Sequence, residues 1–176
     1  AEKRVLVIGR DITERKQAEE ELRQSEELLR ETGEMARVGG WEINFENNTV
    51  YWSPTTRSIH EVPDDYQPTL EEAINFFPPE ARQKLAEAIR KAREDGIPYD
   101  MEIPFITAGG RRLWTRTIGK PDFEAGRCVR LHGTFQDITS IKEARDSLEQ
   151  SERRYRRLIE NVSDTIFIAD REGMIT

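Results

Sequence analysis

Two segments of the chain carry the spacing of hydrophobic positions that is typical of long helices. The first runs from Glu14 to about Arg37, and the second starts near residue 140. The first contains no proline and one glycine and is rich in Glu, Arg, Gln, Leu and Ala, a composition that favours a helix. In both segments the small and apolar positions follow each other at intervals of 4, 3, 4, 3 and 4 residues; they are Ala18, Leu22, Ser25, Leu29, Thr32 and Ala36, then Ala144, Leu148, Ser151, Tyr155, Leu158 and Val162.

Alternating intervals of 4 and 3 residues form the hydrophobic seam of a coiled coil, and the charged residues beside the seam agree with that interpretation. A solvated amphipathic helix that lies on its own domain is the alternative. The Ser and Thr residues at seam positions favour this alternative, because a strong coiled coil has apolar side chains there. On the first interpretation we expect a homodimer through the flanking helices, with a seam made of Leu22, Leu29, Leu148, Tyr155 and Leu158.

Between these two segments the pattern changes from helical spacing to the alternation of strands. Gly39-Gly40 ends the first helix, and WEINF then alternates apolar and polar residues as a half-buried strand does. Asn47-Asn48 is a turn signal, and TVYWS after it predicts the second strand of a hairpin. Three prolines within residues 54–68 leave room for short helices only.

A longer helix and three strands complete the pattern. After Pro78-Pro79, the sequence EARQKLAEAIRKAREDG places its apolar residues on one helical face and ends at Gly96. The runs YDMEIPFIT, RRLWTRTIG and RCVRLHGTFQDI are strand-like and are separated by turn-forming residues. We therefore expect an α+β fold, in which a five-stranded antiparallel sheet has helices packed on one face and is flanked by the two long amphipathic, coiled-coil-like helices.

A short motif occurs twice, once before each long helix. RDITERKQAEEELRQSEE near the start and QDITSIKEARDSLEQSER near the end align with an offset of 126 residues. Solenoid repeats are only about 20–50 residues long, whereas this offset is the size of a whole domain. The repeat therefore predicts an array of domains, of which this chain contains one complete unit.

The Asp-Ile-Thr motif is expected to join a strand to a helix. Its threonine stands where the helix begins and can accept hydrogen bonds from backbone N–H groups of the first turn, while its aspartate places negative charge near the positive helix end. Capping alone is one interpretation; the other is a stiff joint that turns a movement of the sheet into a rotation of the helix. On the second interpretation the residues that transfer the signal are Asp137, Ile138, Thr139, Asp11 and Thr13.

The central segment resembles a PAS sensor domain with its C-terminal PAC portion. The residues that carry the resemblance are GGWEINFENNTVYWSP, YDMEIPFITAGGRRLWTRTIGKP and RLHGTFQDIT. The resemblance implies that residues 1–13 are the C-terminal end of a preceding PAS domain, 14–38 a linker or signalling helix and 39–139 a complete PAS/PAC domain. Residues 140–160 are then a second linker helix, and 161–176 are the beginning of a following PAS domain.

Arrays of this kind resemble the sensing portions of histidine kinases and, less often, of diguanylate cyclases. The resemblance implies a sensory and signal-transmission module of a two-component histidine kinase, which relays conformational changes through its flanking helices to a kinase domain downstream in the same chain. A ligand-free dimerisation and spacer module is one alternative, and the sensor part of a diguanylate cyclase is another.

Composition and charge narrow the partners and the compartment. Lys and Arg number 27 against 34 Asp and Glu, a net charge of −7, so the chain repels a phosphate backbone and we expect no nucleic-acid partner. The single cysteine, Cys128, rules out an internal disulfide framework and fits a reducing compartment. No apolar run approaches the ~20 residues that span a bilayer, so we expect a cytoplasmic segment without membrane contact, in a parent protein whose membrane anchor, if it has one, lies elsewhere.

Catalytic motifs are missing from the sequence. It contains no glycine-rich phosphate loop, no paired-cysteine zinc spacing and neither HExxH nor GxSxG, so we expect no metal site and no catalytic activity in this segment. His60 invites comparison with the phosphoacceptor of histidine kinases, but Pro54, Pro63 and Pro68 deny it the long helix that such a residue occupies. We expect His60 to close a short helix and to be partly exposed.

Relatives in the PAS family hold haem, flavin or small metabolites in the domain interior. Haem-binding relatives supply a histidine from the long helix and photoactive flavin-binding relatives a cysteine from a short helix, but residues 78–96 contain no histidine and Cys128 begins the last strand. We therefore expect no haem, flavin or other tightly held cofactor. The interior is either packed or holds a small apolar or aromatic ligand. In its strand, His132 falls on the face opposite to that of Phe135 and so points away from the interior. The expected lining of the interior is Phe76, Phe77, Met101, Ile103, Phe105 and Phe135.

Overall fold

The computed structural model describes residues 13–160, and the chain divides into two compact units at the Asp137–Ile138 bond. Among the described residues, the first unit contains one long helix, a five-stranded sheet and three further helices, and the second contains a single long helix. Residues 1–12 and 161–176, which carry the expected end of a preceding domain and the expected beginning of a following one, lie outside the described residues.

The order of elements is the one that the hydrophobic pattern predicts. A long helix precedes two strands, three helices follow, and three strands come before the second long helix. The elements are α1 (Thr13–Met35), β1 (Val38–Asn44), β2 (Thr49–Trp52), α2 (Pro54–His60), α3 (Leu70–Asn75), α4 (Pro79–Asp95), β3 (Tyr99–Ile106), β4 (Arg112–Glu124), β5 (Arg127–Asp137) and α5 (Thr139–Glu160).

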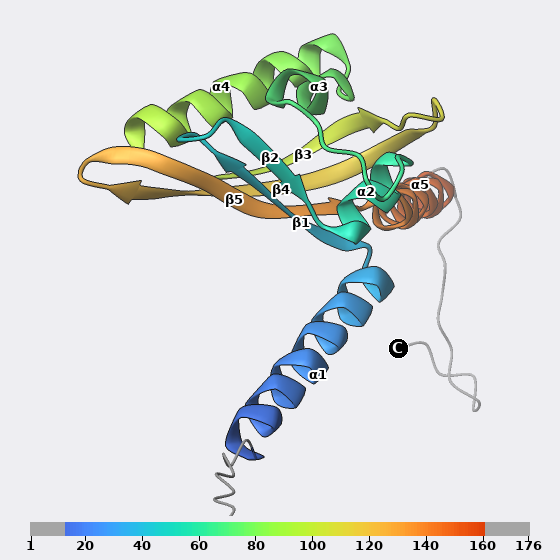
Figure 1. The fold of residues 1–176 in the computed structure, drawn as a ribbon. Helices are drawn as coiled ribbons and strands as arrows, with labels where there is room; N and C mark the ends of the chain where they lie inside the picture. The colour runs from blue at the N-terminus through green and yellow to red at the C-terminus, as the bar shows by residue number, and fades with distance from the viewer. Residues whose placement is uncertain (1–12, 161–176) are drawn as a thin grey trace, which may run out of the picture. The chain divides into compact units, whose positions relative to one another are not determined.

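The five strands form one antiparallel sheet in the order β2-β1-β5-β4-β3. The last strand, β5, therefore lies at the centre of the sheet and pairs with the first strand, β1. The helices α2, α3 and α4 lie on one face of the sheet (Figure 1). The expected α+β fold, a five-stranded antiparallel sheet with helices on one face and a long helix at each end, is confirmed.

The core lies between the sheet and these helices. Along β4 every second residue from Leu113 to Gly119 is buried, as the alternation of a strand requires. The facing side of α4 buries residues spaced by three or four positions, which places them on one helical stripe. The buried hydrophobic residues are Trp41, Ile43, Trp52, Ile59, Phe77, Ala81, Leu85, Ile89, Ala92, Ile103, Phe105, Leu113, Leu131 and Phe135.

Two glycines face each other across β4 and β5, where Gly119 pairs with Gly133. A Cβ atom at Gly133 would lie 1.7 Å from the carbonyl oxygen of Ile118, which is closer than any real contact. A Cβ atom at Gly119 would lie 2.5 Å from the ring of Tyr99. The missing side chains therefore allow the two strands to pair and leave room for the Tyr99 ring beside β4.

Local signals fix the ends of the short helices around the core. The Ser53 hydroxyl accepts a hydrogen bond from the backbone N–H of Thr56 at the start of α2. Thr69 and Glu72 form a capping box at the start of α3. Gly96, with φ of 72°, ends α4 in the left-handed conformation that glycine adopts without strain.

The two long helices expose the residues that were expected to form the dimer seam. Leu22, Leu29, Leu148 and Tyr155 are each at least 60% exposed. The side chain of Leu158 lies outside the described part of the chain. In each unit these residues of the long helix are thus exposed to solvent. That two copies of the chain pair through them stays a prediction.

Candidate functional site

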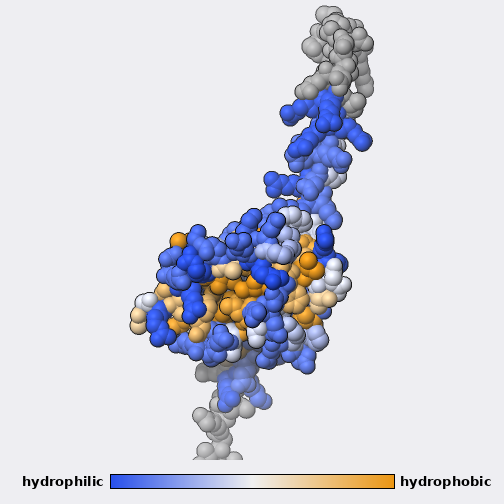
Figure 2. Space-filling model, turned by 90° about the horizontal axis from the view of Figure 1, so that it is seen from above, coloured by the Kyte–Doolittle hydropathy of each residue, from blue (hydrophilic) through white to orange (hydrophobic). Residues whose placement is uncertain are grey.

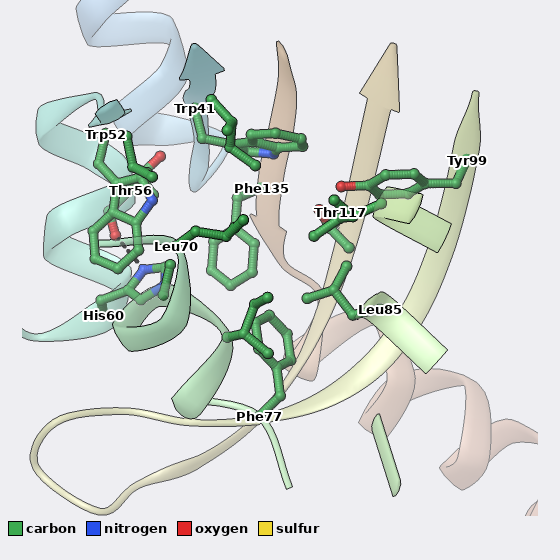
Figure 3. Close-up of a pocket in the computed structure, with 15 residues that line it drawn as sticks. Trp41, Trp52, Thr56, His60, Leu70, Phe77, Leu85, Tyr99, Thr117 and Phe135 are labelled. Carbon is green, nitrogen blue, oxygen red and sulfur yellow. Dashed lines mark hydrogen bonds between the residues drawn. The ribbon is translucent and has the colours of Figure 1, made fainter. Parts of the chain in front are cut away.

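A cavity of about 50 Å³ lies between the sheet and the helices α2, α3 and α4. Figure 3 shows side chains from these helices and from the strands converging on it. Viewed from the helix side, an apolar area bordered by hydrophilic residues is visible at the centre of the domain (Figure 2). The lining residues are Trp41, Ile43, Val50, Trp52, Thr56, His60, Leu70, Ala73, Ile74, Phe77, Leu85, Ile89, Tyr99, Thr117 and Phe135.

Aromatic rings surround His60 at one end of the cavity. The centroid of its imidazole ring lies 3.9 Å from that of Trp52 and 4.7 Å from that of Phe135. Phe105 and Phe76 approach the imidazole edge to face, with centroid distances of 4.6 and 5.0 Å. This end of the cavity is therefore an aromatic cluster with the imidazole at its centre.

His60 is the last residue of α2 and is buried, with 3% of its surface exposed. Its position at the end of a short helix is as expected, but the expected partial exposure is wrong, because the helix directs this residue between Trp52 and Phe135. The Nδ1 atom lies 2.7 Å from the carbonyl oxygen of Thr56. Burial lowers the pKa of His60 to about 4, because the imidazolium would lose its hydration, and the hydrogen bond to Thr56 opposes this effect only in part.

The other end of the cavity carries two hydroxyl groups. Tyr99 and Thr117 lie together on the side of the cavity away from His60 (Figure 3). Burial raises the pKa of Tyr99, because a phenolate would lose its hydration, and the Thr117 side chain opposes this. The indole of Trp41 stacks on the Tyr99 ring at a centroid distance of 6.3 Å.

The lining contains no side chain that is charged at neutral pH. Its two titratable groups, His60 and Tyr99, are both held in their neutral forms by burial. Moving an ionised group into such surroundings without a partner costs a large amount of free energy. The site is therefore suited to a neutral molecule with an apolar body.

Two of the residues expected to line an interior pocket, Phe77 and Phe135, line this cavity. Phe105 and Ile103 are buried in the core beside it, and Phe76 and Met101 are partly buried against that core. All six expected residues therefore lie in or against the core between the sheet and the helices, but only two of them line the cavity. The lining residues that it missed include Trp41, Trp52, His60, Tyr99 and Thr117; the alternation in WEINF and TVYWS was the available signal for the two tryptophans.

Residues 13–160 contain no cluster of three or more His, Cys, Asp or Glu side chains that could hold a metal ion. His132 is absent from the cavity lining, and its Nδ1 lies 3.3 Å from the carboxylate of Asp122. In the same range no helix combines the length and the hydropathy that crossing a membrane requires.

A second candidate site is the place where the chain enters and leaves the domain. The guanidinium of Arg37, which follows α1, lies 2.8 Å from the carboxylate of Asp137, the last residue of β5. The backbone N–H of Asp137 donates to the carbonyl oxygen of Arg37 at 3.2 Å. Arg37 has φ of 51°, so the chain turns sharply between α1 and β1. The end of the incoming helix is thus attached to the end of the last strand.

One of the residues expected to transfer the signal, Asp137, belongs to this second site. Asp137 forms the ion pair with Arg37, a partner that the sequence analysis did not identify. Ile138 is buried, and Thr139 and Thr13 are the first residues of α5 and α1, as the expectation that they begin helices requires. Asp11 lies outside the described residues.

Comparison with known proteins matches residues 49–135 to a family described as the PAS fold. The sensor protein FixL of Bradyrhizobium diazoefficiens is 24% identical over 139 residues, which are 78% of this chain and 28% of FixL. The probable diguanylate cyclase DgcE of Escherichia coli is 25% identical over 170 residues, 94% of this chain and 15% of DgcE. The chain therefore spans less than a third of the length of either relative.

Solved structures agree with this match. A sensory box histidine kinase/response regulator from Burkholderia thailandensis superposes with a TM-score of 0.57 at 26% identity, over 73% of this chain and 98% of that chain. The N-terminal domain of a diguanylate cyclase with a PAS/PAC sensor from Marinobacter aquaeolei gives a TM-score of 0.54 at 18% identity, over 60% of this chain and 98% of that chain. The second likeness concerns the fold alone.

Proposed function

This chain carries a PAS sensory domain, related to those of sensor histidine kinases and diguanylate cyclases, and we propose that it is the sensory and signal-transmission module of a two-component histidine kinase. The observation that carries the proposal is the Arg37–Asp137 pair, which attaches the incoming helix to the strand that leads out of the domain. A transmission module needs such an attachment, because a change inside the domain has to reach the segments on either side of it.

The strand β5 connects the cavity to this attachment. Phe135 lines the cavity, and Asp137, two residues later in the same strand, forms the ion pair with Arg37. A single residue, Ile138, then separates β5 from the first residue of α5. A molecule that displaces Phe135 acts on a strand whose end holds one long helix and continues into the other.

The long helices carry the output of the module. In this proposal two copies of the chain pair along the exposed stripes that contain Leu22 in α1 and Leu148 in α5, so that the domain's movements change how the paired helices pack. The exposure of these leucines supports the proposal. Covering solvated apolar side chains with a second copy of the chain is favourable and would stabilise the dimer.

The PAS domain itself is not the catalytic part of its relatives, which include kinases and a cyclase by name. In this proposal a kinase domain lies downstream in the same protein, and the present segment works in the cytoplasm without contact to nucleic acid or membrane. The sensor part of a diguanylate cyclase is the second candidate, because the alignment with DgcE covers 94% of this chain, both long helices included.

The test is the reaction of the full-length parent protein. We expect the purified protein to incorporate labelled phosphate from ATP and to transfer it to a response regulator. Formation of cyclic diguanylate from GTP, without phosphate incorporation, would replace the kinase by the cyclase. If the output of the parent protein depends on dimerisation of this domain and on no other property of it, the module is a spacer.

A further inference from the structure

Resting on the proposed sensory function, we propose that the cavity binds a small neutral aromatic alcohol of the phenol type, which donates its O–H group to Nε2 of His60. Three features of the cavity point to this class of ligand: the hydrogen bonding of His60, the neutral aromatic lining and the wall formed by α3, none of whose residues is buried.

The hydrogen bond at Nδ1 fixes what Nε2 can do. A carbonyl oxygen accepts hydrogen bonds and cannot donate, so the 2.7 Å contact with the Thr56 carbonyl places a proton on Nδ1 of His60. In a neutral imidazole the other nitrogen then carries the lone pair. Nε2 is therefore an acceptor, and the hydrogen bond that His60 makes to Thr56 does not use it.

The surroundings keep this acceptor available. Burial holds His60 neutral at physiological pH, so Nε2 does not gain a proton of its own. The rings of Trp52, Phe105 and Phe135 that pack around the imidazole offer no hydroxyl group to it. His60 lines the cavity, so a ligand that enters the cavity with a donor group can supply a hydrogen bond to this acceptor.

The rest of the lining selects the body of the ligand. The side chains between His60 and Tyr99 are aliphatic and aromatic, which favours an aromatic ring with offset or edge-to-face contacts (Figure 3). The absence of a charged side chain from the lining disfavours carboxylates, phosphates and ammonium groups. A ring with one hydroxyl group is the simplest molecule that meets both conditions.

The helix α3 is the wall that yields. An apolar cavity of about 150 Å³ takes benzene, so the present volume of about 50 Å³ has to increase before a phenol ring fits. α3 contributes Leu70, Ala73 and Ile74 to the lining, yet none of its residues is buried. An outward movement of this helix therefore exposes less buried surface than a movement of α2 or α4, each of which contains buried residues.

The two ends of α3 are attached differently. At its C-terminal end the backbone N–H of Ile106 donates to the Phe76 carbonyl oxygen at 2.8 Å, and Nη2 of Arg82 donates to the carbonyl oxygens of Asn75 and Phe77. The capping box at its N-terminal end joins Thr69 only to Glu72 within the same helix. α3 thus turns about its C-terminal end, and the Leu70 end opens.

The test is a titration of the chain with phenol, toluene and anisole, followed by calorimetry or by amide chemical shifts. Toluene has the shape of phenol without the hydroxyl group, and anisole has the oxygen without the proton. We expect phenol to bind about tenfold more tightly than either, the difference that one good hydrogen bond makes. In His60→Phe this preference should fall to about one, while His60→Gln, whose amide oxygen also accepts, should keep part of it.

Melting temperatures of both variants control for folding, and the three-ligand comparison on the unchanged chain stands even if His60→Phe does not fold. Equal binding of phenol and toluene, a preference that survives in His60→Phe, or no binding of phenol at millimolar concentration would each overturn the inference. The proposed function fails separately: if phenol binds with the expected preference and phosphorylation of the full-length parent does not respond to it, the inference on the ligand stands and the sensory role does not.

Discussion

The guanidinium of Arg37 and the carboxylate of Asp137 are in contact at 2.8 Å, although the two residues are 100 positions apart. The Asp137 side chain is only 8% exposed, whereas that of Arg37 is 51% exposed. The carboxylate has therefore given up most of its hydration to make this contact. The pair is intermediate between a solvated surface ion pair, which contributes little, and a buried pair, whose disruption is costly.

A double-mutant cycle on this pair measures its strength. We expect Arg37→Ala to lower the free energy of unfolding by about 1–2 kcal/mol, because it removes the contact between the guanidinium and the largely buried Asp137 carboxylate. The coupling energy between Arg37→Ala and Asp137→Ala should be about 1 kcal/mol in urea unfolding experiments. Arg30→Ala, which removes an exposed pair within α1, is the control and should change stability by less. Strict additivity of the two changes would show that the contact stabilises nothing.

Changes at the joint between β5 and α5 should distinguish a sensory module from a spacer module. In the full-length parent, Asp137→Ala together with Thr139→Ala should fix phosphorylation at one level that no longer follows the stimulus. A glycine inserted after Ile138 should do the same, because it adds slack between strand and helix. Both proteins should still fold, since the core is untouched. The measurement is basal and stimulated phosphorylation of both proteins, together with their melting temperatures. Normal responses in both would show that the Asp-Ile-Thr motif only caps the helix.

Stability should depend on pH through His60. Its pKa in the folded protein is about 4, below the ordinary value of 6.5, so the unfolded chain takes up a proton at a pH where the folded one does not. The free energy of unfolding should therefore decrease as the pH falls from about 6.5 to about 4, by about 3 kcal/mol in total. Urea midpoints of the unchanged chain and of His60→Phe across this range provide the measurement. The difference between the two curves isolates His60 from other groups, and parallel curves would contradict the prediction.

The two helical seams should contribute unequally to a dimer. In a parallel, in-register pair of α1 helices, Glu21 of one copy faces Glu26 of the other, which is a repulsive contact, whereas the positions beside the α5 seam carry both Arg and Glu. We expect Leu148→Glu to lower the dimer fraction at least tenfold in light scattering, and Leu22→Glu to lower it less. Gln150→Glu, off the seam of α5, is the matched control. Equal effects of Leu22→Glu and Leu148→Glu would show that the charges beside the two seams do not make their contributions to the dimer unequal.

The glycine pair at β4 and β5 gives a prediction on the sheet itself. Gly133→Ala should destabilise the domain by about 3 kcal/mol or more, because its Cβ would meet the Ile118 carbonyl and force the two strands apart. Gly40→Ala is the matched control in the neighbouring strand, where the nearest atom to a new Cβ is 3.9 Å away. We expect less than about 1 kcal/mol there. Thermal and urea unfolding compare the two, and similar losses would show that the close approach at Gly133 is relieved at no cost.

The element order and the sheet could be predicted from the sequence because they rest on local periodicity. Strands such as WEINF alternate every second residue, and the long helices keep a spacing of 4 and 3 without proline, so each element carries its own signal. The core phenylalanines could be placed in the right layer for the same reason. Phe105, for example, lies between the exposed Pro104 and the half-buried Ile106 in β3 and is buried as expected.

The sites could be predicted only in part, because they depend on contacts between distant residues. Arg37 follows a helix that contains four other basic residues, and nothing in its surroundings in the sequence singles it out as the partner of Asp137. His60 belongs to a helix of seven residues, too short for periodicity to assign its faces. Whether a phenylalanine lines the cavity or packs behind it, the difference between Phe135 and Phe105, is decided by how neighbouring rings fill space.

The contact between Arg37 and Asp137 also bears on how such proteins evolve. Because the chain arrives at the domain and departs from it at one point, the whole unit can be duplicated, deleted or exchanged with little change in the spacing of the segments on either side. A duplication of such a unit would leave two copies of one motif at a fixed offset, as the offset of 126 residues here does. In the expected array of domains, the ion pair would hold the entry and the exit of each unit together, so that units could be added one at a time.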